Sequence, residues 1–177
     1  MKRRPLIIGA GVAAALGGAG IALRDSRKKP LSPAAEKFWA SHFEVLQGGE
    51  LSAASLRGKP LLLNFWAPWC KPCVKELPDI QQFAKETPGW QVLALALDSR
   101  EAVQVFLKQL PLRLPLGLAG LTGFDLVRIL GNTQGGLPFS VVFDTDGEIV
   151  WRKLGPTQLS ELRELTVQDF GVSRHSY

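Results

Sequence analysis

An α/β fold with a central mixed β-sheet flanked by helices is predicted by three features of this 177-residue chain. Short apolar runs of strand length alternate with segments of helical periodicity, which is the pattern of strands connected by helices. The last two predicted strands are instead joined by the tight turn of residues 144–147, which predicts an antiparallel hairpin. Hydrophobic residues make up 46% of the chain, enough for one well-packed core.

The first half of the predicted domain contains a hairpin, a buried strand and a long helix. A glycine-containing turn at residues 47–50 separates two short strand-like runs, which predicts the hairpin. The predicted elements are strands at 43–46, from 51 onward and at 59–66, a helical turn at 52–56, and a helix at 74–86.

The second half continues the alternation and ends in the hairpin and a final helix. Ser99 is predicted to cap one of these helices, with Glu101 in its first turn. The predicted elements are strands at 90–97, 114–118, 139–143 and 148–154, and helices at 99–110, 124–130 and 157–170.

The positive charge of the chain is concentrated at its N-terminus. The formal net charge is +5, but seven of the 21 basic residues and one of the 16 acidic residues precede Leu31. The rest of the chain has a net charge of −1, so it lacks the basic surface that nucleic-acid binding requires.

Residues 5–23 contain no charged side chain and are rich in Ala, Gly, Leu and Ile. A helix of that length spans roughly 28 Å, close to the hydrocarbon thickness of a bilayer. We therefore predict a membrane anchor or signal segment at 1–23, a linker at 24–35 and a folded domain at 36–177. An uncleaved anchor, a cleaved export signal and a buried helix are the alternatives, and the first two both place the domain outside the cytoplasm.

Cys70 and Cys73 are the only cysteines of the chain, and they lie where a predicted strand gives way to a helix. A cysteine at a helix N-terminus is stabilised as a thiolate by unpaired N–H groups and the helix dipole, which selects Cys70 as the nucleophile. Lys71 adds a positive charge that favours the same thiolate. Cys73 lies one turn further on, where it can resolve a mixed disulfide on Cys70. Pro72 suits an early helical position.

A zinc site and a purely structural disulfide are the alternatives to redox chemistry at this pair. Zinc needs four ligands, and the chain offers only His42 and His175 besides the two cysteines, neither at ligand spacing. A bridge over so short a loop removes little chain entropy. The spacing therefore favours a redox-active disulfide, with no metal and no cofactor.

The segment of residues 64–78 resembles the signature of the exported, membrane-tethered TlpA/ResA/CcmG-like thioredoxins. This resemblance implies a thioredoxin-like domain, preceded by an N-terminal β-hairpin and a single transmembrane helix. It also implies that Leu137-Pro138 is a cis peptide facing the cysteines, and that the backbone of Leu137 pairs with the substrate chain. A DsbD- or CcdA-like transmembrane protein is implied as the electron donor.

Glu76 occupies a position at which ResA- and CcmG-like proteins resemble one another in having a glutamate. The resemblance implies that it accepts the proton of the resolving thiol, which requires a raised carboxyl pKa. A solvated helix-face charge is the alternative. Asn64 stands where cytosolic thioredoxins have a buried aspartate, and an amide does not titrate, so proton transfer depends on another group.

Substrate contact is assigned to Trp69, Lys71, Pro72, Leu137 and Pro138. Trp69 is expected to be partly exposed beside Cys70, whereas Trp66, Trp39, Trp90 and Trp151 are expected to serve packing or anchoring. Phe139 departs from the small polar residue of many relatives, a change expected to alter the substrate groove.

The predicted function is thiol–disulfide exchange outside the cytoplasm, most simply as a reductase of client proteins bearing disulfides, such as apocytochrome c in cytochrome c biogenesis. The proline beside the second cysteine favours the reducing direction by resemblance. A copper or haem-assembly chaperone that uses both thiols as ligands is the alternative from another class. A peroxiredoxin-like peroxidase is the second enzymatic alternative.

Overall fold

The computed structural model describes residues 30–46, 48–168 and 170. The predicted anchor and residues 24–29 of the predicted linker lie outside these residues, as does His175. Within the described residues, no helix combines the length and the apolar character needed to cross a membrane.

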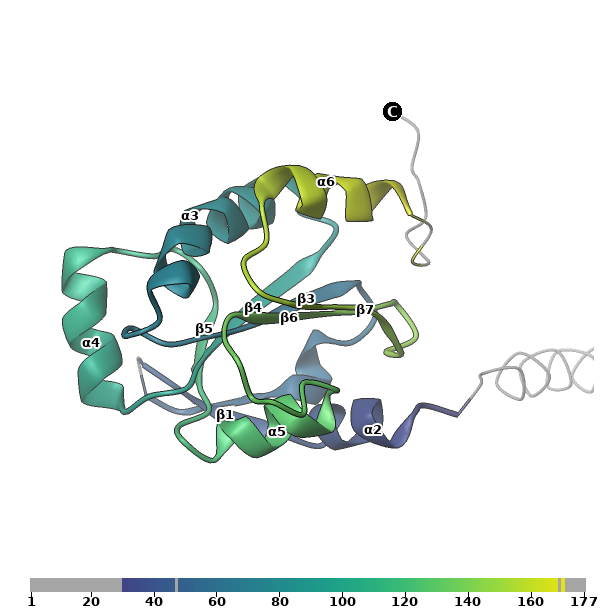
Figure 1. The fold of residues 1–177 in the computed structure, drawn as a ribbon. Coiled ribbons are helices and arrows are strands. Elements are labelled where there is room, and N and C mark those ends of the chain that lie inside the picture. The colour runs from purple at the N-terminus through teal and green to yellow at the C-terminus, as the bar shows by residue number, and fades with distance from the viewer. Residues whose placement is uncertain (1–29, 47, 169, 171–177) are drawn as a thin grey trace, which may run out of the picture. The chain divides into compact units, whose positions relative to one another are not determined.

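A seven-stranded mixed sheet forms the centre of the domain, as Figure 1 shows. β3 is an interior strand, parallel to β4 on one side and antiparallel to β6 on the other. The order across the sheet is β2-β1-β5-β4-β3-β6-β7. The strands are β1 (His42–Val45), β2 (Glu50–Ser52), β3 (Leu61–Trp66), β4 (Gln91–Ala96), β5 (Leu116–Leu118), β6 (Phe139–Phe143) and β7 (Ile149–Leu154).

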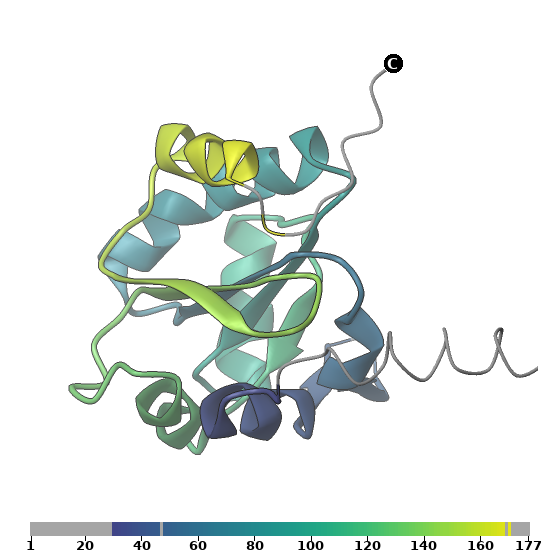
Figure 2. The same ribbon diagram turned by 90° about the vertical axis from the view of Figure 1, so that its right-hand side faces the viewer.

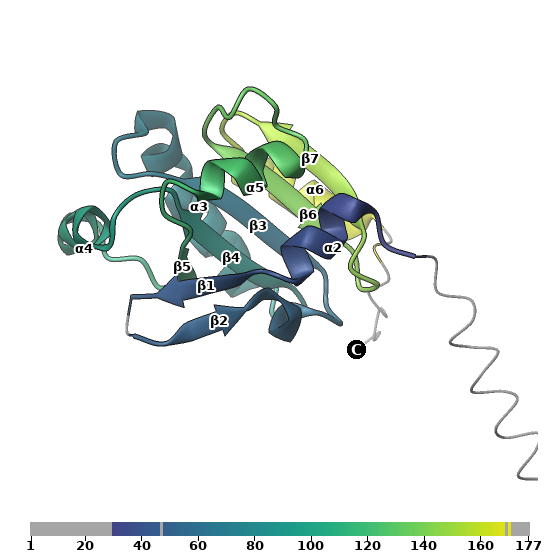
Figure 3. The same cartoon turned by 90° about the horizontal axis from the view of Figure 1, so that it is seen from below.

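Helices cover both faces of this sheet. α3 and α6 pack together on one face, and α2 and α5 lie on the other (Figures 1 and 2). Figure 3 shows α2 and α5 from the side that they cover. The helices are α2 (Pro33–Trp39), the 3₁₀ helix η1 (Ala53–Leu56), α3 (Lys71–Glu86), α4 (Arg100–Gln109), α5 (Gly123–Ile129) and α6 (Leu159–Val167).

Alternation along the central strands produces two separate cores. In β3, Leu61, Leu63 and Phe65 pack with α2 and α5, whereas Leu62 and Trp66 pack with α3 and α6. Successive side chains of a strand point to opposite faces, so a strand covered on both sides reads as a continuous apolar run. Asn64 shares the face of Leu62 and Trp66 and is the only polar residue of β3.

Most of the predicted helices and strands are present, but several begin or end at residues other than those predicted. The helix expected from residue 74 begins at Lys71, and the last helix ends at Val167 because Gln168 has extended backbone dihedrals. α2 was not predicted: Ser32 caps its N-terminus, and Pro33 is its first residue, inside the range expected to be a linker. Ser99 caps α4 as predicted, its side chain accepting from the N–H of Ala102.

Candidate active site

Cys70 and Cys73 form a disulfide at the N-terminus of α3, with the sulfur atoms 2.00 Å apart. Cys70 is the N-cap residue, and its Sγ accepts a hydrogen bond from the N–H of Cys73 at 3.3 Å. Cys70 is 5% exposed and Cys73 is fully buried. Of the two cysteines, Cys70 is therefore the more accessible to an incoming thiol or disulfide, and its role as the nucleophile stays a prediction.

The local sequence explains why the pair lies at this helix end. β3 ends at Trp66, and the chain turns so that the N–H of Cys70 donates to the carbonyl of Ala67 at 3.1 Å. Pro72 lies in the first turn of α3, where its missing N–H leaves no donor unsatisfied. The N–H of Cys73, which donates to Cys70 Sγ, and the positive end of the helix dipole would stabilise a thiolate at Cys70.

The residues around Cys70 are exposed. Trp69 is 60% exposed, and Lys71 and Pro72 also lie at the surface. Beside Trp69, a groove of 530 Å³ runs between the end of β3 and α4, where Val105 is also exposed. The groove is lined by Pro68, Trp69, Asp98, Glu101, Ala102, Val105, Phe106 and Gln109.

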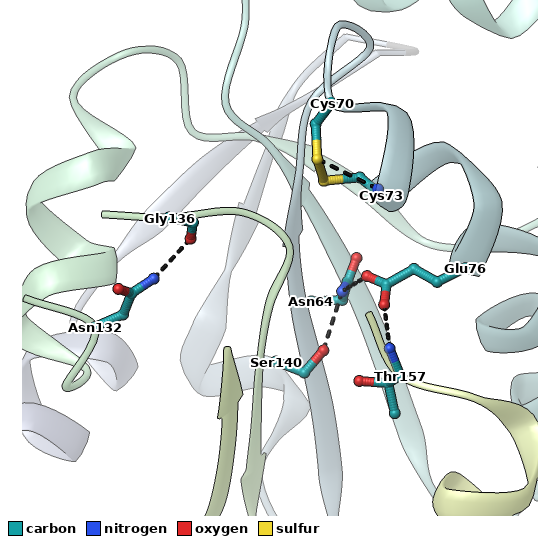
Figure 4. Close-up of a disulfide and its surroundings, with 8 residues drawn as sticks. All are labelled: Asn64, Cys70, Cys73, Glu76, Asn132, Gly136, Ser140 and Thr157. Atoms are coloured by element: carbon teal, nitrogen blue, oxygen red, sulfur yellow. Dashed lines mark hydrogen bonds between the residues drawn. A yellow bond between two sulfur atoms is a disulfide. The ribbon is translucent and has the colours of Figure 1, made fainter. Parts of the chain in front are cut away.

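Glu76 lies one turn after Cys73 on α3 and is 3% exposed, so it is not a solvated surface charge. Its Oε1 accepts from Asn64 Nδ2 at 2.7 Å, and its Oε2 accepts from the N–H of Thr157 at 2.6 Å. Asn64 Nδ2 also donates to Ser140 Oγ at 3.0 Å. Figure 4 shows this buried polar cluster below the disulfide.

Burial raises the pKa of Glu76 from its ordinary 4.5 to about 7, because the ionised carboxylate loses its hydration. The hydrogen bonds from Thr157 and Asn64 and the charge of Lys153 act in the opposite direction, and the charge of Asp79 adds to the rise. A carboxyl group that titrates near neutral pH suits a general base or acid. The raised pKa expected for this residue is therefore present.

The peptide bond between Leu137 and Pro138 is cis, as the family resemblance implied. Leu137 is half-buried and packs against the core cluster that contains both cysteines, and Pro138 is buried. In the preceding loop, Asn132 Nδ2 donates to the carbonyl of Gly136 at 2.7 Å (Figure 4). Phe139 belongs to the opposite core, where it stacks on Phe65, so its bulk is directed away from the cysteine side of the sheet.

The two functional partners that sequence reasoning missed are Ser140 and Thr157. Ser140 stands directly across from Asn64 in the antiparallel register of β3 and β6. A lone serine within an apolar strand is only a weak indication of such a hydrogen bond, because the partner depends on which residue of the neighbouring strand lies opposite the serine. Among the described residues, no group of three or more His, Cys, Asp or Glu side chains could hold a metal ion.

A helix-capping cysteine disulfide and a nearby cis-proline, on a mixed sheet covered by helices, define the thiol–disulfide oxidoreductases of thioredoxin-like fold. The Redoxin family profile matches residues 33–166, and the chain belongs to this family.

Named relatives carry the same activity. The chain is 35% identical over 121 residues to thiol-disulfide oxidoreductase ResA of Bacillus cereus, covering 66% of this chain and 67% of the relative. It is 27% identical over 133 residues to sporulation thiol-disulfide oxidoreductase A of Bacillus subtilis, covering 70% and 75%. The protein is accordingly a thiol–disulfide oxidoreductase.

Solved structures agree with the fold. MTB dsbF, in mixed oxidized and reduced forms, superposes with a TM-score of 0.65 at 30% identity over 76% of this chain and 97% of that one. StoA from Bacillus subtilis superposes with a TM-score of 0.59 at 27% identity over 71% and 95%.

Proposed function

We propose that this protein is a membrane-tethered reductase of disulfides in extracytoplasmic client proteins. The observation that carries the proposal is the pairing of a disulfide at the N-terminus of α3 with a buried carboxyl group one turn further along the same helix. The apolar segment of residues 5–23 supports tethering, and the thiol-disulfide oxidoreductases among its relatives support the exchange chemistry.

Reduction of a client proceeds by two thiol–disulfide exchanges. The Cys70 thiolate attacks one sulfur of the client disulfide, forming a mixed disulfide and expelling the other client sulfur as a thiolate. Glu76 then takes the proton of the Cys73 thiol, and the Cys73 thiolate attacks Cys70 Sγ. The bond between Cys70 and the client breaks, the client leaves with both sulfurs reduced, and Cys70–Cys73 is left as a disulfide.

The exposed rim of the site holds the client during this sequence. The backbone of Leu137 pairs with an extended client segment, and Pro138 sets the direction of that backbone beside the cysteines. Trp69, Lys71 and Pro72 contact the client on the other side of Cys70, and their exposure supports this role. An exposed aromatic side chain supplies contact area with little loss of conformational entropy.

Return of the protein to its dithiol form requires electrons from across the membrane. A DsbD- or CcdA-like transmembrane protein is the proposed donor, and an apocytochrome c in cytochrome c biogenesis is one client class. Delivery to a periplasm or an equivalent extracytoplasmic space follows from the N-terminal segment, whether it is retained as an anchor or cleaved to release the domain.

The experiment is a trap for the mixed disulfide. Cys73→Ser in the full chain removes the resolving thiol, so client proteins are expected to accumulate on Cys70 and to be released by dithiothreitol. Cys70→Ser is the matched control and should capture none, because the remaining Cys73 is buried. Failure of a folded Cys73→Ser protein to retain any client under oxidising growth would overturn the proposal.

The direction of electron flow is tested separately by the reduction potential of the Cys70–Cys73 couple. A value of about −270 mV, typical of thioredoxin, supports reduction, whereas a value of about −120 mV, typical of DsbA, contradicts it.

A further inference from the structure

The buried cluster of Asn64, Glu76, Ser140 and Thr157 leaves two side-chain oxygens without a hydrogen-bond partner among the described residues, Asn64 Oδ1 and Thr157 Oγ1. Asn64 is fully buried, and its Nδ2 donates to both Glu76 Oε1 and Ser140 Oγ. Its Oδ1 is equally buried and has no partner among the described residues. A buried acceptor without a donor is costly, so this arrangement calls for a physical reason.

The arrangement fits only one charge state of Glu76. An ionised carboxylate accepts hydrogen bonds at both oxygens, and both oxygens of Glu76 receive one, from Asn64 and from the backbone of Thr157. A neutral carboxyl group must instead donate its own proton. Neither Asn64 Nδ2 nor the N–H of Thr157 can accept it, so neither of the present hydrogen-bond partners can receive the proton in this orientation.

A half-turn of the Asn64 amide presents an acceptor to the protonated carboxyl group and moves Nδ2 to the buried position that Oδ1 occupies. The amide oxygen and nitrogen are close to isosteric, so they can exchange places within the same buried volume. Oδ1 would then accept the O–H of protonated Glu76. The Ser140 hydroxyl, which accepts from Nδ2 in the present orientation, can rotate to donate to Oδ1.

We propose that Asn64 and Ser140 are positioning residues that form an amide switch, which donates to Glu76 when it is ionised and accepts from it when it is protonated. This inference rests on the proposed role of Glu76 as the proton acceptor for Cys73. In that step the proton leaves Cys73 Sγ for a Glu76 oxygen, the carboxylate becomes neutral, and the Asn64 amide turns over to keep it hydrogen-bonded. The proton returns by the reverse movement when Glu76 ionises again.

The charged groups around Glu76 do not form the hydrogen bonds that Asn64 forms with its carboxyl group. Asp79 acts on it from α3 and Lys153 from β7, but neither is hydrogen-bonded to its carboxyl oxygens. Lys153 Nζ donates to Glu161 Oε2 of α6 at 2.6 Å, and this hydrogen bond lowers the pKa of Glu161. Of the two groups hydrogen-bonded to Glu76, only the Asn64 side chain can change from donor to acceptor, since the Thr157 donor is a backbone N–H.

The test is an NMR titration of the full chain in its oxidised form, from pH 5 to pH 9. The Cδ shift of Glu76 reports its ionisation, and the nuclear Overhauser effect between the Asn64 side-chain NH₂ and the Ser140 Hβ protons reports the amide orientation. The switch predicts that this Overhauser effect is strong at high pH and falls several-fold at low pH, with the same midpoint as the Cδ shift. A merely structural Asn64 would keep the contact unchanged across the range, and that result would overturn the inference.

A second measurement uses Glu76→Gln, whose side chain mimics the neutral carboxyl group and does not titrate. The Asn64 amide should take the turned-over orientation at every pH in this variant, with a weak contact to Ser140 throughout. Retention of the strong contact at all pH values would also overturn the switch. Neither measurement involves a client, so the switch can fail while the trapping experiment still supports the proposed reductase, and the reverse also holds.

Discussion

The burial of one carboxyl group, that of Glu76, affects both the stability of the folded protein and the proton transfer proposed for it. Glu76 is 3% exposed, and the loss of hydration that this entails raises its pKa to about 7. The same burial that makes it a competent base at neutral pH makes its ionised form unfavourable in the folded state. The ionised form of Glu76 therefore lowers the free energy of unfolding, at the same site where the proposed proton transfer takes place.

This cost predicts how the stability of the oxidised protein depends on pH. Below pH 4.5 Glu76 is protonated in both the folded and the unfolded states and contributes no difference. Between pH 4.5 and about 7 the unfolded state loses the proton first, so the free energy of unfolding should fall as the pH rises, by about 3 kcal/mol in total. Urea denaturation at pH 4.5, 6, 7 and 8.5 measures this change.

Glu76→Gln is the matched control for that series, because it keeps the size of the side chain and removes the titration. Its free energy of unfolding should stay nearly level across the same window. Glu86 and Glu161 have lowered pKa values, so they titrate below pH 4.5 and leave the window clear. Parallel slopes for the two proteins would contradict the assignment to Glu76.

Trp69→Ala separates client docking from folding. Because Trp69 is 60% exposed, its removal should change the free energy of unfolding by less than about 0.5 kcal/mol. The rate of reduction of a protein disulfide should nevertheless fall by about tenfold, whereas reaction of Cys70 with a small thiol reagent should be unaffected. Equal rates with protein and small-molecule substrates in the variant and the wild type would exclude a docking role.

At the scale of the elements, short continuous apolar runs made the central strands predictable, but they did not show how the strands pair. The apolar run that ends at Trp66 identified β3 as a buried strand. The hydrogen bond of Asn64 to Ser140 depends on the register between β3 and β6, which are separated by more than 70 residues of chain. Long-range register is decided by packing and turn geometry together, so it was out of reach of local patterns.

α2 illustrates a local signal that was present and was overlooked. Ser32 followed by Pro33 is a favourable N-cap and first-turn pair, and the helix that they begin buries Phe38 and Trp39. The charged, proline-bearing residues that precede it resemble a linker, so the start of the domain was placed too late. Conversely, the last helix was predicted to extend to Phe170, which is buried outside any helix and packs on Trp90.

The close contact of α5 with the sheet predicts a sensitive glycine. A Cβ at Gly123 would lie 2.3 Å from Leu97 Cδ2 and 2.6 Å from Ala119 Cβ. Gly123→Ala should therefore lower the free energy of unfolding by about 1 to 3 kcal/mol, because α5 must move away from β4. Thermal denaturation of the variant measures the loss.

Gly89→Ala is the control for this substitution. Gly89 is exposed, and a Cβ there would meet nothing within 4 Å, so the change should stay within about 0.5 kcal/mol. If both alanines were equally tolerated, the tight packing of α5 would be refuted.

At the scale of the whole molecule, the buried residues of the two cores, among those that the structure describes, begin with Ala35 of α2. Residues 31–177 form one compact unit, and the first helix of this unit contributes Ala35, Phe38 and Trp39 to the core on its side of the sheet. Phe38 stacks on Phe143 with ring centroids 4.6 Å apart, and Trp39 Nε1 donates to the carbonyl of Gly147 at 2.7 Å. The boundary of the folded domain therefore precedes α2.

Two shortened chains test that boundary. A chain that begins at Leu31 should unfold cooperatively at the same urea concentration as the full protein. A chain that begins at Ala40 lacks α2 and should be unfolded or nearly so, since burying Phe38 and Trp39 is each worth about 3 to 5 kcal/mol against a total of about 5 to 15 kcal/mol. Circular dichroism distinguishes them, and a well-folded chain from Ala40 would place the boundary after α2.

Pro138, Phe139 and Ser140 are consecutive, and this restricts where the protein can tolerate insertions and deletions in evolution. Phe139 belongs to the core on the α2 and α5 side, and Ser140 faces Asn64 on the other side, so one inserted or deleted residue here would exchange the two. Lengthening of the loop before Leu137 displaces neither side chain. Variation in length among descendants of this chain should accordingly collect on the amino side of the proline and be absent from its carboxyl side.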